Sequence, residues 1–229
     1  MGRRDRKTGA RYLVCGGLVV AFLVGCVLFA QRDHLLVHYH VRRVVGSSEV
    51  DGDSALWLRN RTMLSLPLLL AQLSHDDAAA CERSAALVRE IIRTCGDPTN
   101  PEDAHLTLAL AAKLNQAFDR FSVDGRGQAV LIAVDVLQIH LSGWSPHVPT
   151  VIENGGDVLL AALADDDIAV KSRALSAEKA IWAWDGTDRV SQALVRDWQR
   201  RCYLRSVELL SSESDEIRAA AADAIARSK

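Results

Sequence analysis

Beyond residue 50 the sequence repeats itself at intervals of about 45 residues, and this feature constrains the fold most. Two stretches align without a gap, "LSHDDAAACERSAALVREII" and "LADDDIAVKSRALSAEKAIW". A third, "LLSSESDEIRAAAADAIA", keeps the order of leucine, acidic turn and alanine-rich segment. With a degenerate copy in the middle, the anchor positions are spaced 48, 42 and 47 residues apart: Leu73, Phe121, Leu163 and Leu210. Units of this length bury their apolar faces by stacking on their neighbours.

Apolar residues recur at helical spacing throughout this region, and only "HYHVRRVV" alternates in a way that suggests a strand. We therefore expect two helices in each repeat, at about 56–95, 103–142, 150–184 and 188–227. Ala174 and Ala177 lie three apart on the second helix of the third repeat, so they share one face. Small side chains on that face predict close helix packing.

The second helices also carry a recognisable signature. It consists of hydrophobic–basic pairs at Val170-Lys171 and Ile217-Arg218, small residues at Ala174/Ala177 and Ala221/Ala224, and turn acids at Asp166 and Asp215. In these features the sequence resembles HEAT-repeat proteins of the armadillo type over residues 55–227. The resemblance implies an all-α fold, with residues 53–229 forming a right-handed α-solenoid of about four helix pairs. It also implies structural ion pairs between Asp76 and Arg83 and between Asp166 and Arg173, not a catalytic set.

The N-terminal part contains an apolar run, "YLVCGGLVVAFLVGCVLFA", from Tyr12 to Ala30. As a helix its 19 residues span about 28 Å, close to the thickness of a bilayer core. The run predicts a transmembrane signal anchor over residues 12–30, after a basic tail over 1–11 and before a juxtamembrane linker over 31–52. Positive charge before the run predicts a cytoplasmic N-terminus, so we expect a single-pass cell-membrane protein with an extracytoplasmic repeat domain.

Two other interpretations of the run stay open. Leu23-Val24-Gly25-Cys26 resembles a lipoprotein signal, which would be cut before a lipidated Cys26. A secretory signal would be cut after Leu28-Phe29-Ala30, although leucine is poor at the first small position. The length of the run, and the apolar residues that follow Cys26, favour the uncleaved anchor.

Charge and cysteine content narrow the remaining possibilities. Beyond Ala30 there are 22 Lys and Arg residues against 28 Asp and Glu residues, a net charge of −6. Such a domain lacks the basic footprint of nucleic-acid binding. Cys81 and Cys95 fall on one predicted helix about 20 Å apart, too far to pair with each other. We interpret them as small buried hydrophobes.

Three segments invite a chemical interpretation, and in each the pattern is incomplete. His34 and His38 share a helix face, but with His40 they lack the further ligands of a metal site. Asp165-Asp166-Asp167 has neither the alternation nor the glycine of a calcium loop, and fits a helix N-cap. "DGRGQAV" has no Lys-Ser/Thr pair and no preceding strand, so it does not match a phosphate-binding loop. The sequence predicts no metal and no cofactor.

The most basic stretch of the repeat domain is the candidate surface for a partner. Its members combine arginine with tryptophan, two residues enriched at interface hot spots: Arg196, Trp198, Arg200, Arg201 and Arg205. Trp198 can instead fill the junction between the last two helix pairs, together with Trp182 and Trp184.

These observations favour a non-enzymatic, membrane-anchored helical-repeat scaffold that binds another protein outside the cytoplasmic membrane. No Ser/His/Asp arrangement, H-E-x-x-H or C-x-x-C supports catalysis. The alternative is an enzyme of unrecognised type, for example one like the HEAT-like lyases, acting through carboxylates in the groove; it rests on analogy alone.

Overall fold

The computed structural model describes residues 31–46, 52–142, 145–178, 182 and 189–228. Within these ranges every regular element is helical, which confirms the predicted all-α class. No helix among them has both the length and the apolar character needed to cross a membrane. The predicted anchor at 12–30, with its Cys26, lies outside the described residues.

The described helices follow one another along the chain. Their bounds are α2 (Arg32–Gly46), α3 (Gly52–Arg59), α4 (Thr62–Ala71), η1 (Gln72–Ser74), α5 (Ala78–Cys95), α6 (Pro101–Ala117), η2 (Phe118–Arg120), α7 (Val123–Ser142), α8 (Val148–Val151), η3 (Ile152–Gly156), α9 (Asp157–Ala164), α10 (Ile168–Glu178), α11 (Arg189–Leu209) and α12 (Asp215–Arg227). The four predicted helix pairs correspond to α4–α5, α6–α7, α8–α10 and α11–α12.

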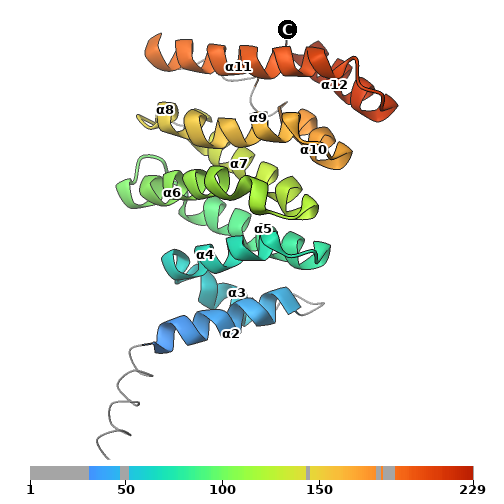
Figure 1. Cartoon of the computed structure of the whole chain (residues 1–229). Coiled ribbons are helices and arrows are strands. Elements are labelled where there is room, and N and C mark those ends of the chain that lie inside the picture. Colours follow the sequence, from blue (N-terminus) through green and yellow to red (C-terminus); the bar gives the residue numbers. More distant parts are fainter. Residues whose placement is uncertain (1–30, 47–51, 143–144, 179–181, 183–188, 229) are drawn as a thin grey trace, which may run out of the picture.

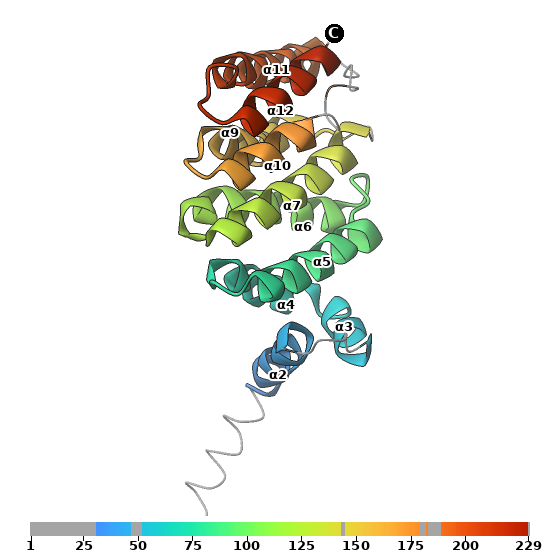
Figure 2. The ribbon, with the colours of Figure 1, turned by 90° about the vertical axis from the view of Figure 1, so that its right-hand side faces the viewer.

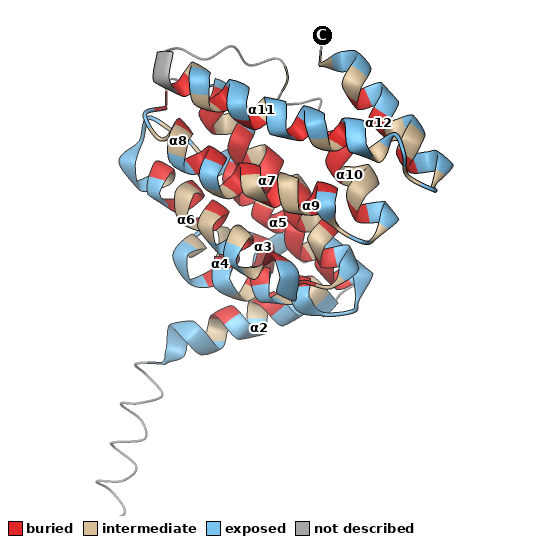
Figure 3. Cartoon of the chain, turned by 45° about the horizontal axis from the view of Figure 1, so that its top comes forward, coloured by how far each residue is buried: buried red, intermediate tan, exposed pale blue. Residues whose placement is uncertain are grey.

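The pairs are layered in chain order, from α2 and α3 at one end to α11 and α12 at the other (Figure 1). The second helices α5, α7, α10 and α12 pack successively on one another, and the first helices lie behind them (Figure 2). Each layer thus buries apolar surface against the layers before and after it. Buried positions line the inner faces of the helices, while the outer turns are exposed (Figure 3).

Local sequence signals set where several helices begin. Asp77 caps α5 by accepting a hydrogen bond from the Ala80 amide at 3.0 Å. Asn100 caps α6 in the same way, and Pro101 takes the first helical position, where its missing N–H costs nothing. Ser214 caps α12. These caps follow the chemistry expected of helix N-termini, so the repeat boundaries are readable locally.

The segment expected as a juxtamembrane linker, 31–52, is largely helix α2. The suggested strand "HYHVRRVV" is wrong, because it lies within this helix. Val37, Val41 and Val44 recur at helical spacing and are buried against the first layers of the stack. Burial at a period of 3–4 residues favours a helix over the alternation that a strand requires.

The anchor positions of the repeat show how far the layers cover one another. Leu73, Phe121 and Leu163 are buried between layers. Leu210 is 41% exposed and follows α11 in the last layer. The same sequence position therefore has two environments, depending on whether a further layer packs over it.

The first helix of the third pair departs from a regular helix. Its first turn α8 continues into η3, a single π-helical turn, and α9 follows directly. A Cβ atom on Gly156 would lie 2.5 Å from Nε1 of Trp198, so glycine at this point lets α11 approach closely. Such π-helical turns mark sites where the helix adjusts to a neighbour.

The small-residue face of α10 is buried as predicted: both Ala174 and Ala177 lie in the core. We expect Ala177→Leu to lower the free energy of unfolding by about 1–3 kcal/mol, because a larger side chain overpacks a filled interface. Urea denaturation of the purified chain measures this, once a single transition has been shown. Ala222→Leu, at an exposed position of α12, is the matched control and should change stability by less than about 0.5 kcal/mol. Equal effects of the two substitutions would contradict the assigned helix face.

Candidate protein-interaction surface

The predicted basic stretch lies on α11, but its five members do not form one surface. Arg196 and Arg200 are exposed. Arg201 lies 3.5 Å from Asp197 on its own helix and 3.9 Å from Asp157 on α9. Arg205 pairs with Glu208 one turn later. Because two of the four guanidinium groups are already paired with carboxylates, the net positive charge of this face is small.

Trp198 is not a surface residue, which corrects its assignment as a partner-binding anchor. Its side chain is 1% exposed and packs against Gly156 in the junction between the third and fourth pairs. This position is the one that the sequence analysis gave as the alternative for Trp198. The candidate partner surface therefore keeps its four arginines but loses its only aromatic member. The large ring fills the space that Gly156 leaves open.

The same junction holds a closed polar cluster. Glu178 at the end of α10 is 2% exposed, and Ser206 of α11 donates to its two carboxylate oxygens at 3.3 and 3.2 Å. Burial raises the pKa of Glu178 to about 8, and the hydrogen bond from Ser206 lowers it only in part. Within the described residues the Nε1 atoms of Trp182 and Trp198, which line the same small void, have no hydrogen-bond partner. Burial also raises the pKa of the nearby Cys202 thiol.

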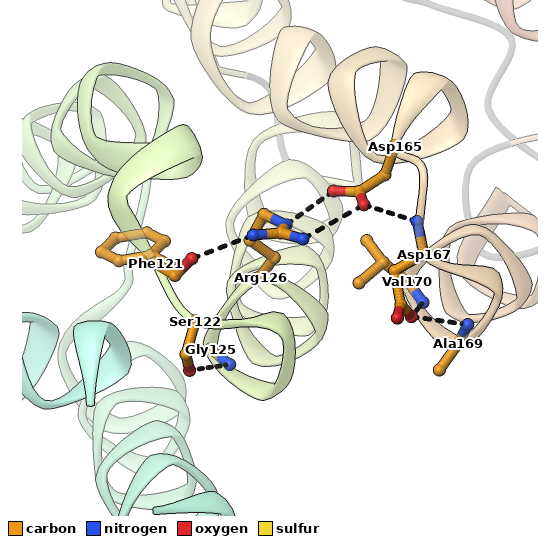
Figure 4. Close-up of polar contacts among 8 residues, drawn as sticks. All are labelled: Phe121, Ser122, Gly125, Arg126, Asp165, Asp167, Ala169 and Val170. Carbon is orange, nitrogen blue, oxygen red and sulfur yellow. Dashed lines mark hydrogen bonds and ion pairs between the residues drawn. The ribbon is translucent and has the colours of Figure 1, made fainter. Parts of the chain in front are cut away.

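Successive layers are joined by arginine–aspartate pairs, although not the predicted ones. Arg126 near the start of α7 donates from Nε and Nη2 to Asp165 in the next repeat, at 2.6 and 3.2 Å, and from Nη1 to the Phe121 carbonyl oxygen (Figure 4). Arg89 of α5 binds Asp135 of α7 in the same bidentate manner. Bidentate geometry fixes both distance and orientation, so these pairs set the register between layers.

The pairs inferred from the HEAT resemblance are wrong in their partners. Arg83 donates from Nε to the carbonyl oxygen of Val45 at 2.8 Å, not to Asp76. Asp165, not Asp166, accepts the inter-layer arginine, and that arginine is Arg126, not Arg173. The resemblance implied pairs of arginine with aspartate, and the structure has such pairs between other residues. Comparison of the repeats with one another does not show that a pair joins two repeats.

The aspartate run and the glycine-containing segment have structural roles in the described chain. Asp167 accepts hydrogen bonds from the amides of Ala169 and Val170, as the predicted N-cap of α10 (Figure 4). Ser122 accepts from the Gly125 amide at the start of α7, and a Cβ atom on Gly125 would lie 1.8 Å from the Leu73 carbonyl oxygen. The glycine therefore allows close approach of two layers.

The histidines are also placed by packing. His34 and His38 are exposed on α2, while the ring of His40 stacks on Trp57 and its Nδ1 lies 2.9 Å from Ser54 Oγ. His140 is fully buried in α7. Its Nε2 atom is hydrogen-bonded to Thr107 Oγ1 at 2.8 Å, and its Nδ1 atom to Ser145 Oγ at 2.7 Å. Burial lowers the pKa of His140 to about 4, so the ring is neutral at pH 7. In the part of the chain that is described, no group of three His, Cys, Asp or Glu could hold a metal ion.

Two open cavities lie between the first helices α4 and α6, and sequence reasoning missed both. One, of about 500 Å³, is lined by Thr62, Met63, Pro101, Glu102, Asp103, His105 and Leu106. The other, of about 350 Å³, is lined by Pro67, Leu70, Ala71, Ser74, Lys113, Gln116, Ala117, Arg120 and Phe121. A visible signal was the exposed Met63 in a strongly apolar helix interrupted by Pro67.

Comparisons of the chain with protein-family models, with curated proteins and with solved structures found no match.

Proposed function

We propose that the chain is a membrane-anchored helical-repeat scaffold, and that its stacked helix pairs are a HEAT-like, right-handed α-solenoid that binds another protein outside the cytoplasmic membrane. The observation that carries the proposal is where the open surface lies. The cavities between α4 and α6 open to solvent and combine apolar with charged side chains, as protein interfaces do. The buried polar side chains Glu178 and His140 are instead hydrogen-bonded to neighbouring side chains inside the stack.

Site-specific photocrosslinking of the full-length chain in its native membranes tests the binding role. Photoreactive residues would replace exposed side chains on α4, on α6 and on α11, one at a time. We expect a defined covalent adduct with one protein species, identified by mass spectrometry, from a contiguous set of these positions. The absence of adducts from every position, or turnover of a small substrate by the purified chain, would overturn the proposal.

The anchor has a separate test. We expect the full-length chain to resist carbonate extraction and to keep its original N-terminus, because an uncleaved apolar helix of this length remains in the bilayer. A mature chain that begins at a lipid-modified Cys26, together with blocked processing of Cys26→Ser, would show a lipoprotein instead.

A further inference from the structure

We propose that the groove between α4 and α6 binds one amphipathic helix of a partner protein, which carries an apolar stripe, acidic side chains at one end and basic side chains at the other. This inference deepens the proposed scaffold function and rests on it, because it names the binding face and the chemistry of the partner.

The proposed groove comprises the two cavities, which lie at opposite ends of the space between α4 and α6. The larger one lies where α4 and α6 begin, at Met63 and Leu106, and the smaller one lies where both helices end, at Ala71 and Ala117. The two helices therefore run parallel along the groove. The lining residues of α4 recur at helical spacing from Met63 through Pro67 to Ala71, so both cavities open on the same face of that helix.

The dimensions of the groove fit a short helix. At a rise of about 1.5 Å per residue, the α6 side from Glu102 to Ala117 is about 22 Å long. A helix of about 15 residues covers this length. The trough between two parallel helices accepts the ridge of a third, and each cavity is large enough for apolar side chains of that ridge.

The walls supply apolar surface that a partner can cover. Met63 is 63% exposed, and Pro67 one turn later is also exposed. The buried Leu70 and Leu106 form part of the floor. Exposed apolar groups above an apolar floor are the arrangement used when an amphipathic helix lays its apolar face into a groove.

The charges at the two ends have opposite sign, and they indicate the polarity of the occupant. Glu102 and Asp103 line the cavity at the start of the helices, and no Lys or Arg lines it. Lys113 and Arg120 line the cavity at the other end, and no Asp or Glu lines that one. The helix dipole of α6 adds about half a positive charge near the two acids and about half a negative charge near the two basic residues. Each end of the groove therefore keeps the sign of its side chains. A complementary helix therefore places basic groups over the acids and acidic groups over Lys113 and Arg120.

The test uses synthetic 16-residue peptides, acetylated, amidated and fluorescently labelled, with the purified full-length chain. The polarised peptide has a leucine–alanine stripe, two Glu in its first turn and two Lys in its last turn. The matched control has the same composition, with one Glu and one Lys at each end. We expect the polarised peptide to bind about tenfold more tightly by fluorescence anisotropy, because the control faces one unfavourable charge at each end.

Charge reversal in the groove distinguishes binding at this site from nonspecific binding of the peptides elsewhere on the chain. The double variant Lys113→Glu and Arg120→Glu makes both ends acidic, so it should lose the preference for the polarised peptide and bind best a peptide with Lys at both ends. Arg227→Glu, at an exposed position of α12 in the last layer, is the matched control and should leave the preference unchanged. Equal binding of the polarised and control peptides to the wild-type chain, or an unchanged preference in the double variant, would overturn the proposal.

Two further outcomes separate the possible causes of failure. A polarised peptide with a central proline cannot form a continuous helix. If it bound as tightly as the original, the occupant would not be a helix and the proposal would fall. If the peptides failed to discriminate while photocrosslinks from α11 identified a protein partner, the scaffold function would stand and only the groove would be excluded. Absence of crosslinks from every helix would remove the scaffold function itself.

Discussion

Gly125→Ala should lower the free energy of unfolding by about 3 kcal/mol, although alanine is the better helix former by about 1 kcal/mol. Gly125 lies in the first turn of α7, and a Cβ atom there would meet the Leu73 carbonyl oxygen at 1.8 Å. Because the obstacle is the backbone of Leu73 within η1, relief requires two layers of the stack to separate. The measurement is urea denaturation of the full-length chain, with wild type and variant compared under the same conditions.

Two other glycines provide matched controls for this prediction. Gly52 begins α3 with nothing within 4 Å of the added atom, so Gly52→Ala should change stability by less than about 0.5 kcal/mol. At Gly127 the added atom would meet the end of the Arg173 side chain, which can move, so the loss should be smaller than at Gly125. Equal stability of all three variants would contradict the close approach of α7 to Leu73.

The sequence predicts features of the helical architecture that depend on local pattern. Apolar spacing predicted the helix pairs, and the N-cap predicted in the aspartate run is Asp167, which accepts hydrogen bonds from two amides of its own helix. The small-residue face at Ala174 and Ala177 is likewise a property of one helix. These signals involve residues within a few positions of one another, so a single sequence contains them in full.

Features that depend on contacts between layers were not predictable in the same way. The partner of Arg126 is Asp165, 39 positions away, and only the stacking geometry selects it over the neighbouring Asp166. Trp198 has the residue type of an interface hot spot, yet Gly156 on the neighbouring helix leaves the space in which its ring is buried. The groove between α4 and α6 arises from two helices about 40 residues apart, and its charge polarity appears only once they lie side by side.

The second large effect is a dependence of stability on pH through Glu178. Its pKa is about 8 in the folded chain against 4.5 for an ordinary glutamate, because the carboxyl group is buried at the junction of α10 and α11. Between these values the folded state binds more protons than the unfolded state, so stability falls as pH rises. For a site this deeply buried, the wild-type chain should lose about 2 kcal/mol between pH 6.5 and pH 8.5 from this group.

Glu178→Gln keeps the shape of the side chain and removes the titration, so the variant should show little of this loss and should exceed the wild type in stability at pH 8.5. The pH window also excludes His140, a second buried group whose pKa is strongly shifted. The pKa of His140 is lowered to about 4 from 6.5, so its unfavourable protonation affects stability as pH falls from 6.5 toward 4 and contributes almost nothing above that range.

Urea denaturation at three pH values between 6.5 and 8.5 measures the difference in stability between wild type and Glu178→Gln. Parallel pH profiles for wild type and Glu178→Gln would show that Glu178 is already ionised when folded, with Ser206 and solvent stabilising its charge. A steeper loss in the wild type would show that this layer junction is held together by a neutral carboxyl group.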